Sequence, residues 1–138
     1  MIMDFEKTTS LAREEWRELH SGARTVILVG TATCGRAAGA LEVLDIFRRE
    51  SEKRGLDWEI IEVGCIGLCF AEPLVTITKP SRPGICYGDM DAKKTAEVIE
   101  KYLLGDDPLP GYALGTIGEG TVEGIPALFE TPVFKPQI

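Results

Sequence analysis

The feature that most constrains the fold is a pair of short β-rich segments separated by one helical segment. Residues 25–30 read TVILVG and residues 58–63 read WEIIEV, and both have the length and composition of strands. Between them, apolar residues recur with a helical period up to about Arg54, and Gly55 ends the helix. This order predicts two parallel strands joined by a right-handed crossover.

Two more strands are predicted after this unit, at residues 74–78 and 85–87. The turn-rich residues 79–84 between them favour a chain reversal, so these two strands should be antiparallel. Residues 91–104 predict a helix, because their apolar side chains share one face and Gly105 follows as a helix-ending glycine. This is the order of a thioredoxin-like α/β layer, with a four-stranded mixed sheet and flanking helices.

Both ends of the chain are predicted to lie outside this layer, which spans residues 25–104. Residues 1–24 predict an N-terminal helix, in which Trp16 lies on the apolar face and is expected to pack in the core. Residues 105–138 are rich in Gly and Pro without a sustained period, and they predict an extended arm. The arm carries apolar residues that need a surface to lie on, namely Leu128, Phe129, Val133 and Phe134.

The charge balance excludes several classes of partner. The 138 residues carry 15 basic and 22 acidic side chains, a formal net charge of −7. This argues against binding to nucleic acid or an anionic membrane surface, where clustered Lys and Arg supply the affinity. No apolar run approaches the roughly 20 residues of a membrane span. The first ten residues, MIMDFEKTTS, also lack the basic start and apolar block of a signal peptide. We therefore expect a cytoplasmic protein without direct membrane insertion.

The chain has one histidine, His20, and four cysteines, Cys34, Cys65, Cys69 and Cys86. A single histidine excludes sites that need two imidazoles, such as a Rieske centre. In an intracellular protein, cysteines more often bind metal or undergo redox reactions than form structural disulfides. Loops that follow parallel strands open at the same edge of the sheet. Because Cys34 follows the first strand, and Cys65 and Cys69 follow the second, these three thiols should converge.

The spacing of the cysteines narrows the chemistry. Zinc hairpins typically use C-x2-C pairs, whereas Cys65 and Cys69 form a C-x3-C pair. A thioredoxin-type dithiol needs C-x-x-C, but Ala37 stands where the second thiol would follow Cys34. An iron–sulfur cluster suits these loops better, because glycines let backbone N–H groups reach its sulfides and apolar neighbours limit water. The glycines are Gly35, Gly64 and Gly67, and the apolar neighbours are Ile66, Leu68 and Phe70.

Three segments together resemble the thioredoxin-like [2Fe-2S] ferredoxin domain, namely TATCGRAAGA, VGCIGLCFAEPLV and ICYGDM. That domain occurs in the small subunit of NADH:quinone oxidoreductase (complex I). It also occurs at the N-terminus of flavoprotein subunits of NAD-linked and electron-bifurcating hydrogenases and of formate dehydrogenases. The tail IPALFETPVFKPQ resembles the linker that leads into the FMN- and NADH-binding domain of those flavoproteins. The chain is therefore expected to be either a truncated flavoprotein subunit or a stand-alone subunit.

The resemblance implies a [2Fe-2S] cluster bound by cysteines, with one departure. The complex I small subunit has a C-x4-C pair in its first loop, but Gly39 stands at the second position here. The flavoprotein relatives often keep only the first cysteine of that loop, so the departure points toward them. We expect the ligands to be Cys34, Cys65, Cys69 and Cys86, the last because its strand runs back toward the edge where Cys69 lies. The alternative for Cys86 is a half-buried strand cysteine that only packs.

By resemblance, the chain is a one-electron carrier, a module or subunit of an NAD(P)H-linked oxidoreductase complex that is not catalytic on its own. Its partners would be an FMN- and NADH-binding flavoprotein domain or subunit and other iron–sulfur subunits. Residues 115–120, GTIGEG, neither follow a βαβ strand nor open a helix, so no nucleotide binding is expected from this chain alone. Two alternatives stay open, a cluster-free domain that docks a partner through residues 105–138, and a structural zinc-binding domain.

Three residues near the predicted cluster have their own interpretations. Pro73 is expected to be the cis-proline that precedes the third strand of thioredoxin-like folds, with ordinary trans packing as the alternative. Glu72 and Arg36 are interpreted as solvated surface charges rather than as groups that flank the cluster.

Overall fold

The computed structural model describes residues 4–134. The strands are β1 (Thr25–Gly30), β2 (Trp58–Val63), β3 (Val75–Thr78), β4 (Gly84–Tyr87) and β5 (Ala113–Ile117). The α-helices are α1 (Phe5–Leu19), α2 (Thr33–Ala38), α3 (Ala40–Arg54) and α4 (Ala92–Val98), and a π-helical turn, η2 (Ile99–Leu103), continues α4. Short 3-10 helices lie at η1 (Cys69–Ala71), η3 (Leu128–Glu130) and η4 (Pro132–Phe134). The strands form one mixed sheet in the order β2-β1-β3-β4-β5, so the predicted mixed α/β fold is confirmed, with a fifth strand added.

Strands β1 and β2 form the one parallel pair of this sheet, in register from the pair Thr25–Trp58 to the pair Gly30–Val63. Both strands therefore end at the same edge. The pairing continues beyond β1, where the Thr31 N–H donates to the Val63 carbonyl oxygen at 3.0 Å. The predicted strand–helix–strand unit is confirmed, and the loops that follow β1 and β2 begin side by side.

The connection between β1 and β2 is made of two helices rather than the single one predicted. Gly39 separates α2 from α3 in the left-handed conformation, with a φ of +106°. Glycine adopts this conformation without the steric cost that a Cβ would add, so Gly39 both ends α2 and starts α3. The end of α3 is as predicted, at Gly55, whose φ is +62°.

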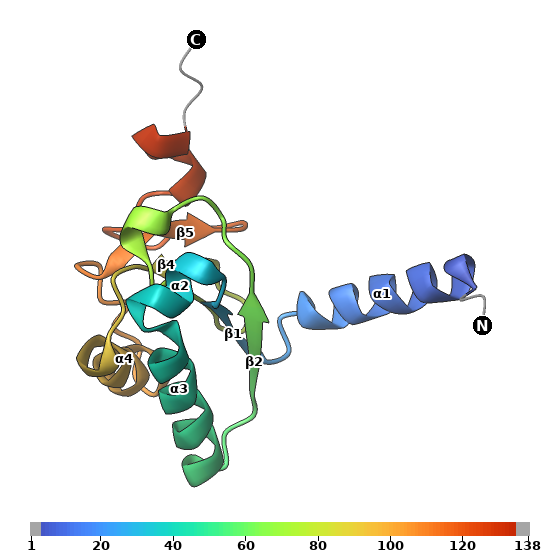
Figure 1. Ribbon diagram of the computed structural model, residues 1–138, viewed down its shortest axis with the longest axis horizontal. Helices are drawn as coiled ribbons and strands as arrows, with labels where there is room; N and C mark the ends of the chain where they lie inside the picture. The colour runs from blue at the N-terminus through green and yellow to red at the C-terminus, as the bar shows by residue number, and fades with distance from the viewer. Residues whose placement is uncertain (1–3, 135–138) are drawn as a thin grey trace.

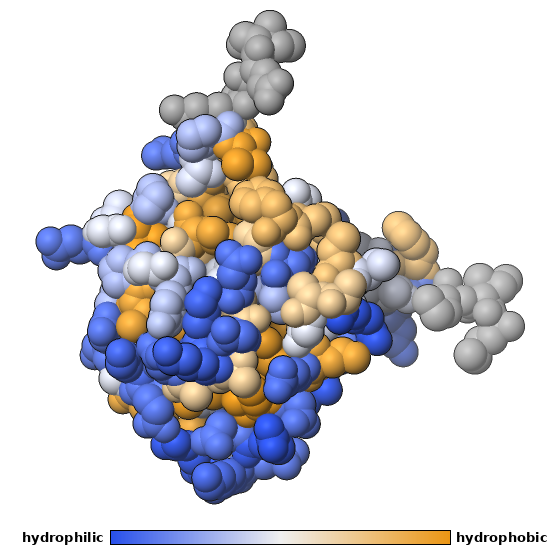
Figure 2. Space-filling view, turned by 60° about the vertical axis from the view of Figure 1, so that its left-hand side comes forward, coloured by the Kyte–Doolittle hydropathy of each residue, from blue (hydrophilic) through white to orange (hydrophobic). Residues whose placement is uncertain are grey.

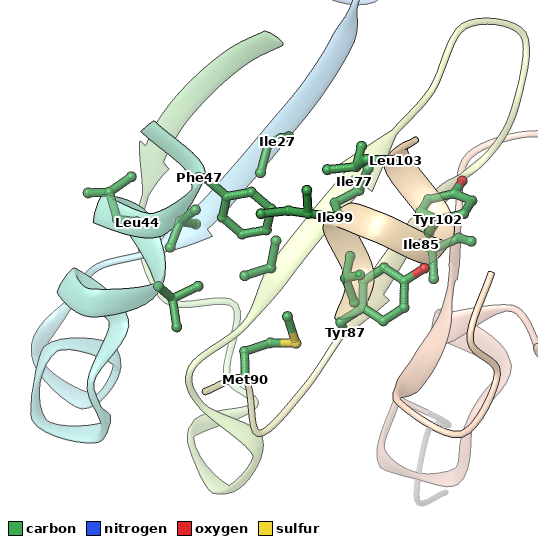
Figure 3. Packing of buried hydrophobic residues seen from close by; sticks show 14 of the residues in the cluster. Ile27, Leu44, Phe47, Ile77, Ile85, Tyr87, Met90, Ile99, Tyr102 and Leu103 are labelled. Carbon is green, nitrogen blue, oxygen red and sulfur yellow. The ribbon is translucent and has the colours of Figure 1, made fainter. Parts of the chain in front are cut away.

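The main apolar core lies between one face of the sheet and the helices α3 and α4 (Figure 3). Side chains alternate along a strand, so Ile27 and Val29 of β1 face this core together with Ile85 and Tyr87 of β4. Full burial of such a side chain stabilises the fold by about 1.5–3 kcal/mol. The predicted apolar face of α3 is confirmed by its buried residues, which are Ala40, Val43, Leu44 and Phe47.

The opposite face of the sheet carries a second, smaller apolar cluster. Cys86 belongs to it, because Cys86 lies between Ile85 and Tyr87 in β4 and its side chain points the other way. The cluster joins residues that are far apart in the sequence, from the loop after β2 to η3. Its buried members are Leu68, Ala71, Leu74, Cys86 and Leu128.

The C-terminal part of the chain contributes β5, which pairs antiparallel with β4. Gly115 of β5 lies so close to η3 that a Cβ on Gly115 would be 2.5 Å from the Leu128 Cα. Leu128 is therefore buried, in agreement with the expectation that this apolar side chain needs a surface to lie on. Phe134 packs partly against the second cluster, whereas Phe129 and Val133 stay exposed.

Helix α1 projects away from the sheet (Figure 1), and none of residues 5–19 is buried. The Asp4 carboxylate caps its start by accepting from the Glu6 N–H at 3.1 Å. Trp16 is 64% exposed and stacks on the His20 ring, with 3.8 Å between ring centroids. The expected core position of Trp16 is therefore wrong, because the helix that carries it leaves the body of the molecule. Within residues 4–134, no helix has the length and apolar character needed to span a membrane.

Candidate functional site

The candidate site lies where β1 and β2 end. Cys34 stands in the first turn of α2, directly after β1, and Cys65 stands in the loop directly after β2. Cys69 begins η1, at the end of that same loop. All three cysteines are exposed, so the predicted convergence of two loops at one edge of the sheet leaves their thiols accessible.

Cys65 and Cys69 form a close pair. Their Sγ atoms are 3.4 Å apart, and the Gly67 N–H donates to the Cys65 Sγ at 3.2 Å. Gly67 has a φ of +90°, which turns the loop back so that its two ends meet. Two metal–sulfur bonds of about 2.3 Å at a tetrahedral angle hold their sulfurs slightly under about 4 Å apart. The donor pair therefore fits a metal ion or one iron of a cluster.

Cys34, in the first turn of α2, does not join this pair. Within residues 4–134, no three Cys, His, Asp or Glu side chains are gathered closely enough to hold one metal ion. Around Cys34, Arg36 anchors α2 to the edge, since its Nε donates to the Thr31 carbonyl oxygen at 2.8 Å. The Arg36 side chain is exposed and its guanidinium lies 3.8 Å from the Glu62 carboxylate, in keeping with the solvated charge expected for it.

Cys86 is fully buried, with 0% of its surface exposed. It packs in the second cluster with Leu68 and Ala71, which lie on either side of Cys69 in the sequence. Burial raises the pKa of the Cys86 thiol, the nearby Glu72 charge raises it further, and a hydrogen bond with Thr76 partly offsets both. Cys86 thus lies beneath the loop of the exposed pair as a protonated thiol, and its role as a ligand stays a prediction.

Glu72 is a functional candidate that the sequence interpretation missed. The residue is only 7% exposed, so its interpretation as a solvated surface charge is wrong. One carboxylate oxygen, Oε2, accepts from the Leu74 N–H at 2.8 Å, and Oε1 has no hydrogen-bond partner within residues 4–134. The carboxylate lies against the backbone of Gly30 and Gly35, between the two cysteine loops. Its apolar surroundings in the sequence, CFAEPLV, are the signal that could have identified it. The Glu72–Pro73 bond is cis, as expected for Pro73.

The apolar residues of the second loop divide into two groups. Leu68 is buried in the second cluster and anchors the loop, whereas Phe70 is 71% exposed and Ile66 is also exposed. Ile66 and Phe70 therefore do not form the buried apolar cover expected of them, whereas Leu68 packs in the second cluster. Figure 2 shows apolar surface gathered toward the end of the molecule nearest the C-terminal segment, while hydrophilic side chains cover the opposite end.

Comparison with curated proteins finds one relative that identifies a family. The chain is 31% identical over 96 residues to the NADP-reducing hydrogenase subunit HndB of Solidesulfovibrio fructosivorans. The matched region covers 69% of this chain and 76% of that protein. No family model matches the sequence.

Comparison with solved structures identifies the fold. A thioredoxin-like [2Fe-2S] ferredoxin from Aquifex aeolicus superposes with a TM-score of 0.60 at 19% identity, over 70% of this chain and 94% of that one. A structure of the wild-type Aquifex aeolicus protein gives a TM-score of 0.58 at 20% identity, over 67% and 97% of the two chains. The predicted thioredoxin-like fold is confirmed.

Proposed function

Because this chain belongs to the family of HndB, a subunit of NADP-reducing hydrogenase, we propose that it carries single electrons through one [2Fe-2S] cluster within a hydrogenase-type oxidoreductase complex. The observation that carries the proposal is the exposed Cys65–Cys69 pair at the end of the parallel strands. The ferredoxins that share the fold are named as [2Fe-2S] proteins, which supports the choice of cluster. When bound, such a cluster supplies a one-electron redox centre.

The ligands in this proposal are Cys65, Cys69, Cys34 and Cys86. The first two have the strongest support, because their sulfurs are already in contact. Cys34 is supported by its exposed thiol on the adjacent loop. Cys86 is supported by its place beneath Leu68 and Ala71, although it must lose its proton and the loop must shift for it to bind.

Other groups of the chain would tune and shield the site. The Gly67 N–H is already directed at a cysteine sulfur, and hydrogen bonds to ligand sulfurs adjust the reduction potential of iron–sulfur centres. The exposed side chains of Ile66 and Phe70 lie next to the sulfur pair and offer an apolar surface for close approach by a partner. We propose a flavoprotein domain or subunit linked to NAD(P)H, or another iron–sulfur subunit, as that partner.

The test is anaerobic purification followed by iron and acid-labile sulfide analysis and EPR spectroscopy after dithionite reduction. We expect equal iron and sulfide and a paramagnetic signal on one-electron reduction. Loss of an outer-shell partner of a metal site typically lowers metal affinity by about 10–100-fold. Cys65→Ser and Cys69→Ser each remove a proposed ligand itself, so each should lower cluster content by more than such a loss does. A protein with full iron and sulfide in either variant would contradict the proposal, as would a colourless wild-type protein that contains zinc.

The fourth ligand is tested by a matched pair of variants. If Cys86 binds iron, Cys86→Ser should change the EPR spectrum of the reduced protein as much as Cys34→Ser does. If Cys86 only packs, the EPR spectrum of the Cys86→Ser variant should equal that of the wild type, while the Cys34→Ser variant still loses cluster. Far-UV circular dichroism of both variants checks that the fold is intact.

A further inference from the structure

The Cys65–Cys69 pair can undergo two-electron chemistry that the electron-carrier function does not use. Its sulfurs are 3.4 Å apart, and a disulfide bond is about 2.05 Å long, so closure needs a shift of roughly 1.4 Å. Cys65 lies in residues 64–68, which have no regular structure, and Cys69 directly follows them, so side-chain and backbone rotation in this segment can supply that shift. The turn at Gly67 already brings the two ends together.

Access separates this pair from the other cysteines. Both thiols of the pair are exposed, as an attacking reagent requires. Cys86 is fully buried and its pKa is raised by burial, so it is inert toward reagents in solution. Cys34 is exposed but lies on a different loop, at the start of α2. The chain therefore holds one close, exposed dithiol and two matched controls.

We infer that Cys65 and Cys69 form a reversible dithiol–disulfide site whenever no metal occupies them. The oxidant is a low-molecular-weight disulfide such as oxidised glutathione. The thiolate of one cysteine attacks a sulfur of that disulfide, forms a mixed disulfide and displaces one small thiolate. The second cysteine, as its thiolate, attacks the mixed disulfide at the first cysteine and releases the other small thiolate. The chain loses two electrons and two protons, and the oxidant becomes two thiols.

Closure of this disulfide would block metal binding, because both sulfurs would be bonded to each other. This consequence rests on the proposed function, whereas the disulfide itself does not. An oxidised chain would have to be reduced before it could be loaded with iron. The redox state of Cys65 and Cys69 would then follow the ratio of thiols to disulfides in the surrounding compartment until metal is bound.

The experiment uses metal-free, fully reduced protein equilibrated with mixtures of reduced and oxidised glutathione, then quenched with an alkylating reagent. Intact mass and peptide mapping count the free thiols. We expect the oxidised chain to carry two fewer alkyl groups than the reduced chain, no glutathione on Cys65 or Cys69, and complete reversal by dithiothreitol. Cys34→Ser and Cys86→Ser should close in the same way.

Single variants of the pair separate closure from simple thiol reactivity. Cys65→Ser and Cys69→Ser should each retain one glutathione on the remaining thiol, because no second thiol resolves the mixed disulfide. A stable glutathione adduct on Cys65 or Cys69 of the wild-type protein, or a disulfide that includes Cys34, would overturn the inference. Iron-loaded protein that forms the Cys65–Cys69 disulfide while it keeps its iron would contradict the ligand assignment and support the disulfide site alone.

Discussion

The position of Cys34 depends on the glycine that follows it. Gly35 lies against the end of β1, so that a Cβ on Gly35 would be 2.2 Å from the Gly30 carbonyl oxygen and 3.2 Å from the Glu72 carboxylate. Real Cβ atoms essentially never approach backbone so closely. The thiol of Cys34 is therefore held at the edge of the sheet by close packing of α2 on the backbone of β1.

Gly35→Ala should destabilise the protein and displace α2. We expect the free energy of unfolding to fall by about 1–3 kcal/mol, the usual cost of adding a methyl group to a packed site. Urea unfolding followed by circular dichroism measures the change. Gly111→Ala is the control, because nothing lies within 4 Å of a Cβ there, and it should stay within about 0.5 kcal/mol of the wild type. Equal stability of the two variants would show that α2 is not held in this way.

Short-range sequence patterns were enough to predict the placement of some site residues but not of others. Three residues separate Cys65 from Cys69 in one glycine-containing loop, so their proximity follows from local chain geometry. The burial of Glu72 depends on Gly30 of β1 and Gly35 of α2, which are far from it in the sequence and meet it only in the folded chain. The burial of Cys86 also required the strand register, because a single-residue shift would point its side chain to the other face.

Among the strands and helices, β4 and η2 each bury a tyrosine in the main core. Tyr87 of β4 donates its hydroxyl to the Pro108 carbonyl oxygen at 2.8 Å, whereas the buried Tyr102 hydroxyl of η2 has no partner within residues 4–134. Burial raises the pKa of Tyr87, and the neighbouring Tyr102 and Asp107 add to the effect. Burial also raises the pKa of Tyr102, partly offset by the positive charge of Arg82.

Stability should therefore fall in alkaline solution. A tyrosine in the unfolded chain loses its proton near pH 10, whereas the folded state keeps the protons on Tyr87 and Tyr102 to higher pH. The unfolded state then binds fewer protons than the folded state, so the free energy of unfolding decreases as pH rises above about 10 and is unaffected by these groups below about 9. Urea midpoints from pH 8 to pH 11 measure the slope.

Tyr102→Phe provides the control for this pH dependence. The variant removes one titrating group without removing a hydrogen bond, so the alkaline decrease in its stability should be shallower than in the wild type. An identical slope in wild type and variant would assign the decrease to other groups.

Strand β5 and the break between α2 and α3 were not predicted from the sequence, because local patterns do not reveal them. Residues 113–117 form β5 only because β4 offers an edge and Leu128 packs on Gly115, and neither contact is visible as a local pattern. The break between α2 and α3 depends on the left-handed conformation of Gly39, which a helical apolar period does not reveal. By contrast, the crossover and the parallel pair followed from periodicity and order alone.

The molecule consists of a packed body, formed by the sheet and the helices on it, and helix α1, which lies outside that body. Helix α1 has no buried residue, so its stability rests on its own hydrogen bonds and the Asp4 cap rather than on the core. Strands β1 and β3 lie in the centre of the sheet and bury Ile27, Val29, Val75 and Ile77 almost completely.

Hydrogen exchange should separate these two parts. Amides of α1 should exchange by local opening, far faster than those of β1 and β3, which exchange only when the whole domain unfolds. Mass-spectrometric exchange of the isolated chain measures both at once. Equal protection of α1 and β1 would mean that α1 is covered in solution, contrary to its exposed placement here.

The parallel pairing of β1 with β2 also sets an order of events during biogenesis. Cys34 and Cys65 belong to loops that lie next to each other only after the complete α2–α3 crossover has closed, a non-local step that is slow compared with local turns. A ribosome-bound chain would thus present its thiols separately. The edge at which both cysteines stand is complete only on a chain that has finished folding.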